Sequence, residues 1–159
     1  MPRIKLGHIA NQWRHAPHDI QVNCWNFEVE AARIATAHFK ESFTKNAFND
    51  TRGARWPKRS PNYHASHPLL RETRTLYRSI TWEHQRRKGA KVWTDPSKFS
   101  TTKRHRGFCF AAVHNEGLPF TAFGKKPMNM PKRQFIGDSK SLERKLDRII
   151  PLLFKHLPH

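Results

Sequence analysis

The chain has 159 residues, of which 30 are Lys or Arg and 12 are Asp or Glu, so its formal net charge is +18. This length suits a single domain, residues 1–159, and 5 Trp with 11 Phe supply bulky core residues, which excludes a chain disordered throughout. No apolar run approaches the roughly 20 residues needed to cross a bilayer, and residues 1–10 lack the core of a signal peptide, so the sequence predicts a cytosolic protein.

The N-terminal part predicts an extended arm followed by a long helix. Residues 1–15 show little periodicity and are expected to form the arm. From Pro17 to about Asn46 apolar residues recur at steps of three and four, which is typical of an amphipathic helix. The residues expected on its inward face are Ile20, Cys24, Phe27, Ala31, Ile34 and His38. The cysteines Cys24 and Cys109 are expected to be small buried hydrophobes rather than a disulfide.

The middle of the chain predicts a loop, a short helix and a hairpin. Residues 52–68 are rich in Arg, Pro, Asn and Ser, and the loop is expected to be anchored by Trp56. Residues 69–79 predict a short helix with Leu70 and Leu76 facing inward. Residues 79–94 alternate around Arg86-Arg87-Lys88-Gly89 and predict a hairpin with a basic tip, whose tryptophans, Trp82 and Trp93, belong to the core.

The C-terminal third predicts two strands and a helix. Residues 108–113 form the most apolar short run and predict a central strand, and residues 133–136 predict an edge strand. A helix capped by Asp138 or Ser139 follows, and Pro151 should kink or divide it. The sequence therefore predicts an α+β domain in which a long N-terminal helix and a C-terminal helix pack on a small antiparallel sheet with long basic loops.

The positive charge is concentrated in the middle of the chain. Residues 51–106 carry 15 basic and 3 acidic residues, a net charge of +12 out of the total of +18. A surface this basic favours a polyanionic neighbour such as a nucleic acid, an acidic protein or a lipid surface. The cations expected to contact that neighbour lie at the hairpin tip and in the loop after it: Arg86, Arg87, Lys88, Arg104 and Arg106.

Candidate chemical sites in the sequence are weak. His15 with His18 and His64 with His67 have a three-residue spacing, but no Cys pair or acidic cluster completes a zinc site. The tripeptide His114-Asn115-Glu116 resembles a nuclease acid/base group without the additional ligands such an enzyme needs, and a structural turn ending at Gly117 explains it better. We therefore expect no catalytic residue, no metal and no cofactor.

Three ordered segments resemble one family. They follow Trp56-Pro57 in the order that this family shows. Residues 69–80 resemble "LL-x-x-(T)-G-x-L-x-x-S-I", residues 110–117 resemble "Y-A-x-I-H-N-E-G", and residues 130–139 resemble "M-P-x-R-x-F-I-G-x-S". In this order the segments resemble the tail-completion, or virion morphogenesis, proteins of Mu-like tailed phages, over residues 20–157. Arg74 or Thr75 stands where the family has glycine, and Phe110 replaces its tyrosine.

The resemblance implies a non-enzymatic neck component that forms a ring at the head-proximal end of the tail. Implied partners are further copies of the chain, head-proximal adaptor or connector proteins, tail terminator or tail tube proteins, and DNA in the channel through non-specific contacts. The implied location is the virion, with host cytoplasm during assembly, and no membrane. The motif residues implied to be structural are Trp56, Leu70, Ser79, His114, Gly117, Pro131, Phe135 and Gly137.

Two other functions remain open from the residues themselves. The charge also fits a basic nucleic-acid-binding protein, such as a packaging or ribosome-associated factor. A metal-dependent nuclease that uses His114 is the third alternative.

Overall fold

The protein is described here by a computed structural model. It describes residues 16–59, 61, 69–71, 73–85, 88–99, 110–121 and 128–155. The helices are α2 (Ala16–Lys45), α3 (Thr75–Ser79), α4 (Phe110–Glu116) and α5 (Lys140–Asp147), with 3₁₀ turns at Pro96–Lys98 and Ile150–Phe154. The strands are β1 (Ile80–Gln85), β2 (Gly89–Thr94), β3 (Pro119–Phe120) and β4 (Met128–Asn129). The predicted α+β class is confirmed, and the predicted arm at residues 1–15 lies outside the described residues.

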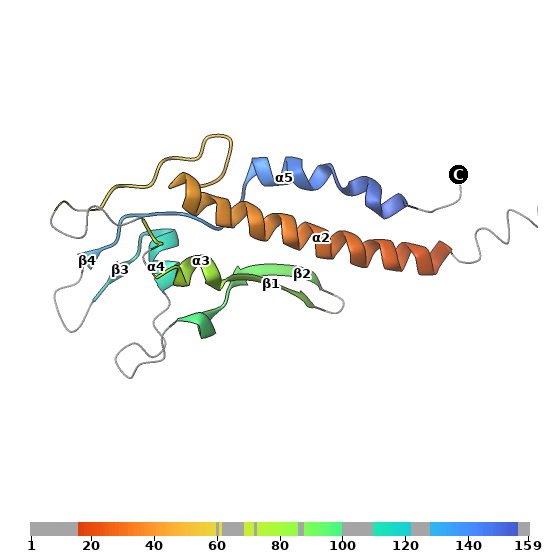
Figure 1. The fold of residues 1–159 in the computed structure, drawn as a ribbon, viewed down its shortest axis with the longest axis horizontal. Coiled ribbons are helices and arrows are strands. Elements are labelled where there is room, and N and C mark those ends of the chain that lie inside the picture. The colour runs from red at the N-terminus through yellow and green to blue at the C-terminus, as the bar shows by residue number, and fades with distance from the viewer. Residues whose placement is uncertain are drawn as a thin grey trace, which may run out of the picture.

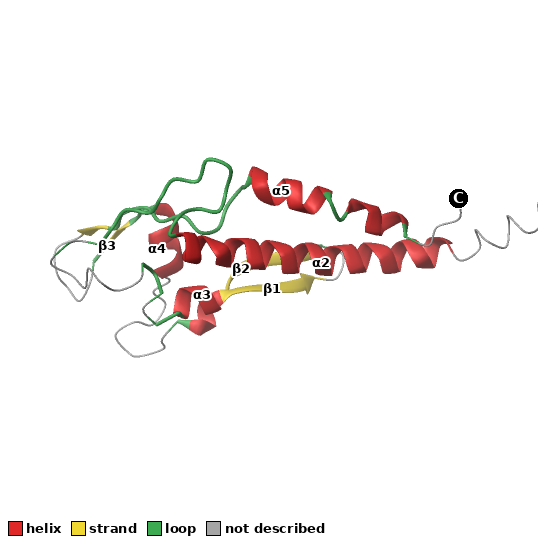
Figure 2. Cartoon of the chain, turned by 45° about the horizontal axis from the view of Figure 1, so that its top comes forward, coloured by secondary structure: helices red, strands yellow, loops and turns green. Residues whose placement is uncertain are grey.

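Helix α2 is the axis of the fold. Figure 1 shows it running through the middle of the molecule, with α5 along one side and the β1–β2 hairpin along the other. The short elements α3, α4, β3 and β4 gather near its C-terminal end, as the turned view in Figure 2 also shows. The core is consequently built around the C-terminal half of α2, where Ala35, Phe39 and Phe43 are buried.

The predicted long helix is confirmed, whereas its predicted inward face is wrong at the N-terminal end. Ile20 is 43% exposed and Cys24 is exposed, so Cys24 is not the buried residue that we expected. Asn23 is buried instead, because its side-chain amide donates hydrogen bonds to the carbonyls of Leu153 (3.3 Å) and Lys155 (2.6 Å). Hydrogen bonding to the C-terminal 3₁₀ turn, rather than apolar burial, sets which face of α2 is covered there.

The predicted hairpin is confirmed. Strands β1 and β2 pair in antiparallel register from Ile80 opposite Thr94 to Gln85 opposite Gly89. Gly89 has φ 79°, the left-handed value that the tight turn requires. Trp82 and Trp93 point to opposite faces of the hairpin and are half-buried, so neither is a fully buried core residue.

Three predicted elements differ from the structure. The apolar run predicted as a strand at residues 108–113 is helix α4 from Phe110 onward, with Ala111 and Val113 on its buried side. The helix predicted at residues 69–79 covers only Thr75–Ser79. It is short because Leu70 and Arg74 adopt φ values of 55° and 56°, which a right-handed helix cannot contain.

The edge strand predicted at residues 133–136 is also absent from the described segment 131–139. Phe135 is buried as a strand residue would be, but the backbone N–H groups of Phe135 and Ile136 donate to the side chain of Asn115. A side-chain acceptor thus replaces the neighbouring strand.

The C-terminal helix follows the prediction. Ser139 caps α5 by accepting a hydrogen bond from the N–H of Leu142 (3.2 Å). After α5 ends at Asp147, the chain continues as a 3₁₀ turn, Ile150–Phe154, which contains Pro151. Ser139 is itself buried, and its hydroxyl donates to the carbonyl of Asn49 (3.0 Å). The cap therefore joins α5 to the loop that follows α2.

His38 binds the same serine from α2. Its Nδ1 lies 3.1 Å from the Asn49 side-chain nitrogen, which is a donor, so Nδ1 accepts and Nε2–H donates to Ser139 Oγ over 3.0 Å. His38 is 1% exposed, and burial lowers its pKa, followed by the effect of the Lys145 charge. A neutral histidine, an amide and a serine hydroxyl thus fix α5 against α2.

We predict that Ser139→Ala lowers the free energy of unfolding by about 1–2 kcal/mol, because it removes a helix cap and leaves buried partners unsatisfied. Urea unfolding followed by circular dichroism measures the change. Ser97→Ala, on the exposed 3₁₀ turn, is the matched control and should change stability by less than about 0.5 kcal/mol. Equal effects of the two substitutions would show that Ser139 does not stabilise the packing of α5 against the loop after α2.

Candidate functional site

The segments that carry the family resemblance meet at the C-terminal end of α2. Phe43, which is fully buried, is the centre of this junction. Its ring contacts Trp56 and Tyr77 edge-on at centroid distances of 5.5 and 5.9 Å, and it packs against tilted Phe135 at 5.2 Å. Aromatic pairs at such distances add to the stabilisation from burial. Each of the three segments contributes to the core around Phe43. Leu70 and Ile80 come from residues 69–80, Ala111 from residues 110–117 and Phe135 from residues 130–139.

Trp56 anchors its loop as predicted. The side chain is 6% exposed, and its indole N–H donates to the carbonyl of Gln134 over 2.7 Å. This bond joins the loop after α2 to the irregular segment 131–139. A buried indole requires such an acceptor, so the position demands tryptophan for both its ring and its N–H.

The tripeptide at the end of α4 holds the same segment from the other side. Asn115 Oδ1 accepts hydrogen bonds from the N–H groups of Phe135 (2.9 Å) and Ile136 (3.0 Å). The carbonyl of His114 accepts from the N–H of Arg133 over 2.7 Å. Gly117 ends the helix with φ 72°, and a Cβ there would lie 2.9 Å from the Cβ of Lys132. These contacts explain the tripeptide and its glycine as a structural turn.

Arg133 is a buried cation bound to carbonyls. It is 6% exposed, its Nε donates to the carbonyl of Pro57 (3.0 Å), and its Nη2 donates to that of Lys58 (3.3 Å). Burial, and then the nearby Arg59 charge, lower its pKa, although a guanidinium remains protonated at neutral pH. Arg133 thus closes the loop that starts at Trp56.

His114 lies beside these two arginines. Its Nδ1 is buried and has no hydrogen-bond partner among the described residues. Burial lowers the pKa of His114 to about 4, with the charges of Arg133 and Arg59 contributing further. The imidazole is therefore neutral at physiological pH.

Among the described residues, neither Glu116 nor a metal-binding group accompanies His114. Glu116 is exposed and its carboxylate accepts from the Asn115 amide rather than contacting the imidazole. Within the described part of the chain, no three His, Cys, Asp or Glu side chains are grouped so that they would hold a metal ion. His64 and His67 of the weak zinc pattern, and His15, lie outside that part.

The remaining motif residues have structural or peripheral positions. Ser79 is fully buried; its hydroxyl donates to the carbonyl of Leu76 (2.8 Å), and its own carbonyl accepts from the N–H of Asp95 (2.7 Å). Arg74, one of the two residues that stand where the resembling pattern has glycine, adopts a left-handed conformation with φ 56°. Gly137 lies in a bend before α5, and Pro131 is exposed.

The basic residues proposed from the sequence are only partly covered by the structure. Lys88 is exposed beside Gly89 in the hairpin turn, while Arg86, Arg87, Arg104 and Arg106 lie outside the described residues. Many other cations of the middle region are exposed: Arg52, Arg55, Lys58, Arg74, Arg78, Lys91 and Lys98. The described surface therefore keeps the positive character that the sequence indicates.

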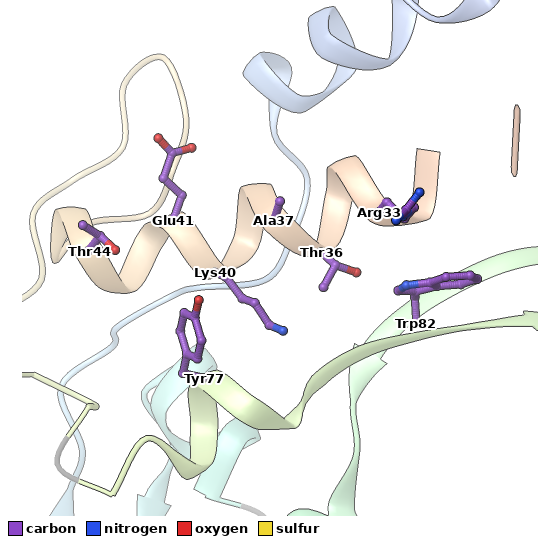
Figure 3. Close-up of a pocket in the computed structure, with 8 residues that line it drawn as sticks. All are labelled: Arg33, Thr36, Ala37, Lys40, Glu41, Thr44, Tyr77 and Trp82. Atoms are coloured by element: carbon purple, nitrogen blue, oxygen red, sulfur yellow. The ribbon is translucent and has the colours of Figure 1, made fainter. Parts of the chain in front are cut away.

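A groove between α2 and the hairpin was not foreseen from the sequence. It has a volume of about 450 Å³ and lies between one face of α2, Tyr77 and Trp82. Figure 3 shows Lys40 and Thr36 pointing from α2 toward these aromatic rings, with Glu41 on the other side of the helix. No local signal marks it, because its two walls are 40 residues apart in the sequence and meet only through packing. The lining residues are Arg33, Thr36, Ala37, Lys40, Glu41, Thr44, Tyr77 and Trp82.

The comparisons with known proteins identify no relative. Neither family models, nor curated proteins, nor solved structures match this chain. Among the described helices, none is both long and apolar enough to span a membrane, including the 30-residue α2.

We predict that His114 makes stability depend on pH. Its pKa is about 4 in the folded protein and about 6.5 in an unfolded chain, so only the unfolded chain gains a proton as the pH falls between these values. The free energy of unfolding should therefore decrease by up to about 3 kcal/mol from pH 7 to pH 4 because of this residue. Urea unfolding at a series of pH values measures the slope.

The His114→Gln variant provides the control, since glutamine does not titrate while His38 does so in both proteins. The variant should show a clearly shallower decrease between pH 6.5 and pH 4.5. Identical slopes would contradict the assignment of a buried, neutral imidazole at position 114.

Proposed function

We propose that this chain is a structural virion protein of a tailed bacteriophage, a tail-completion component of the neck that forms part of the head–tail connection. The observation that carries the proposal is the set of contacts that the motif residues make. The side chains of Trp56, Asn115 and Ser79 form hydrogen bonds with backbone groups of the protein, and Phe135 lies in the core. Residues used in this way specify a shape, which is what an assembly protein must supply.

The partners proposed for the chain follow from its surface. Adaptor or connector proteins on the head side, and tail terminator or tail tube proteins on the other, would meet exposed cations, and DNA in the channel would meet them without sequence recognition. An acidic protein face and a phosphate backbone are both attracted by such a surface. The proposal is thus for a non-enzymatic protein whose contacts are made by charge and shape.

The ring proposed for the assembly finds support in exposed apolar side chains. Ile20, Val22 and Trp25 on the N-terminal part of α2 are 43%, 42% and 53% exposed, and Phe154 on the packed 3₁₀ turn is 62% exposed. Large apolar residues exposed together at one end of a molecule are typical of protein–protein contacts. A second copy of the chain would cover them in a ring.

We predict that reversing the basic hairpin tip blocks head–tail joining without unfolding the protein. The triple variant Arg86→Glu, Arg87→Glu, Lys88→Glu should give free heads and free tails by electron microscopy when it replaces the natural chain in an infection. Its circular dichroism spectrum should match that of the unaltered protein, because Lys88 is exposed. The loss of infectious particles should be at least about tenfold, since charge complementarity governs both encounter and register.

A variant with the same charge change on α5 is the control. Lys140, Arg144 and Arg148 are exposed, and their replacement by Glu should leave particle yield near normal. Normal yield from the hairpin variant would refute the role of the tip. Tight binding of the purified chain to one DNA sequence over others would instead favour the nucleic-acid-binding alternative, because neck proteins need no sequence recognition.

A further inference from the structure

The groove between α2 and β1 has the features of a peptide-binding site. Its walls are the α2 face that carries Arg33, Thr36 and Lys40 and, opposite, the rings of Tyr77 and Trp82 (Figure 3). No residue of β2 lines it, so the groove lies on the β1 side of the hairpin. The groove is shallow and open to solvent, with a volume of about 450 Å³.

β1 is an edge strand of a two-stranded sheet. The sheet contains β1 and β2 alone, so within the described residues no third strand pairs with the far edge of β1. Alternate N–H and C=O groups along such an edge are available to another extended chain, which can add as a strand. Because α2 packs on both β1 and β2, a strand added at that edge would extend the sheet that the helix covers.

A buried hydroxyl in the groove also lacks a partner. Thr36 Oγ1 is inaccessible to solvent and forms no hydrogen bond with described residues. Solvent does not reach this oxygen, so a peptide in the groove would contact the cations of the α2 face rather than this hydroxyl.

The charges of the groove select an acidic occupant. Lys40 Nζ lies 5.3 Å above the Tyr77 ring, and the side chain of Arg33 is 69% exposed with its nearest carboxylate, Glu30, 3.8 Å away. Glu41 points away and is neutralised by Lys45 (3.2 Å) and Lys145 (3.5 Å). The groove is therefore net positive, and a second copy of a chain with net charge +18 is a poor occupant.

We propose that this groove binds an extended, acidic segment of another protein, which adds as a third strand to β1 and places carboxylates against Arg33 and Lys40. The combination of one open strand edge with one cationic helix face favours a peptide over a nucleic acid backbone, because a peptide both donates to and accepts from the strand edge, whereas phosphate groups offer acceptors alone. The inference goes beyond the proposed function and does not rest on it. Any acidic partner of the chain, in a virion or elsewhere, would serve.

The test uses the full chain and a fluorescein-labelled peptide, (Glu-Val)₄, blocked at both ends. Fluorescence anisotropy should show saturable binding. A peptide of the same charge with two Val replaced by Pro should bind at least about tenfold more weakly, because proline cannot donate to the strand ladder. An eight-nucleotide single-stranded DNA should fail to displace the acidic peptide.

Matched protein variants locate the binding. The double variant Arg33→Glu, Lys40→Glu should weaken peptide binding by about tenfold or more, because it reverses both groove cations. The double variant Arg52→Glu, Lys58→Glu carries the same charge change on exposed loop residues and should bind nearly as the unaltered chain does.

Four results would overturn the inference. They are no binding of (Glu-Val)₄, equal weakening by the two charge-reversal variants, indifference to the proline substitutions, or displacement of the peptide by DNA in a manner that depends on Lys40. None of these readouts involves particle assembly. A failure here therefore leaves the proposed neck function standing, and a failure of head–tail joining leaves the groove assignment standing.

Discussion

The fold depends on the contact of Phe43 with three aromatic rings at the end of α2. Trp56, Tyr77 and Phe135 come from separate parts of the chain, and each meets the fully buried Phe43 ring within 6 Å between centroids. With few strands to form ladders, the segments around this cluster are held by side chains that bind backbone groups. Asn115 and the Trp56 indole do so for the segment 131–139, which a strand would otherwise have to hold. Removing one ring would loosen all of these segments together.

Sequence patterns correctly predicted the elements that are specified by residues close together in the sequence. The helix α2, the glycine turn of the hairpin and the serine cap of α5 each follow from neighbouring residues, and all three are confirmed, although the apolar spacing of α2 mispredicted its covered face near the N-terminus. The patterns failed where hydrogen bonds between residues far apart in the sequence determine the local structure or burial. Phe135 has the burial of a strand residue, yet its N–H pairs with Asn115, 20 residues away, and Asn23 is buried by carbonyls 130 residues away or more.

The candidate site divides in the same way. The motif residues around Trp56 and His114 were predicted to be structural, and their contacts are those of a packed junction. The groove escaped prediction because Lys40 and Tyr77 come together only when α2 packs against Tyr77 of α3. The sequence showed that the positive charge is concentrated in residues 51–106, whereas the pairing of Lys40 with the Tyr77 ring depends on the fold. Buried motif residues thus hold the fold, and many cations of the middle region remain exposed.

The central claim is that the motif residues hold the fold rather than act on a ligand, and Asn115 tests it most directly. Unfolding of Asn115→Ala in urea should show a loss of about 2–3 kcal/mol, because two backbone donors lose their acceptor. Asn115→Asp, which keeps an acceptor oxygen at the same place, should retain most of the stability. An Asn115→Ala protein as stable as the unaltered chain would contradict this claim and would favour a ligand-binding role for the Asn115 side chain.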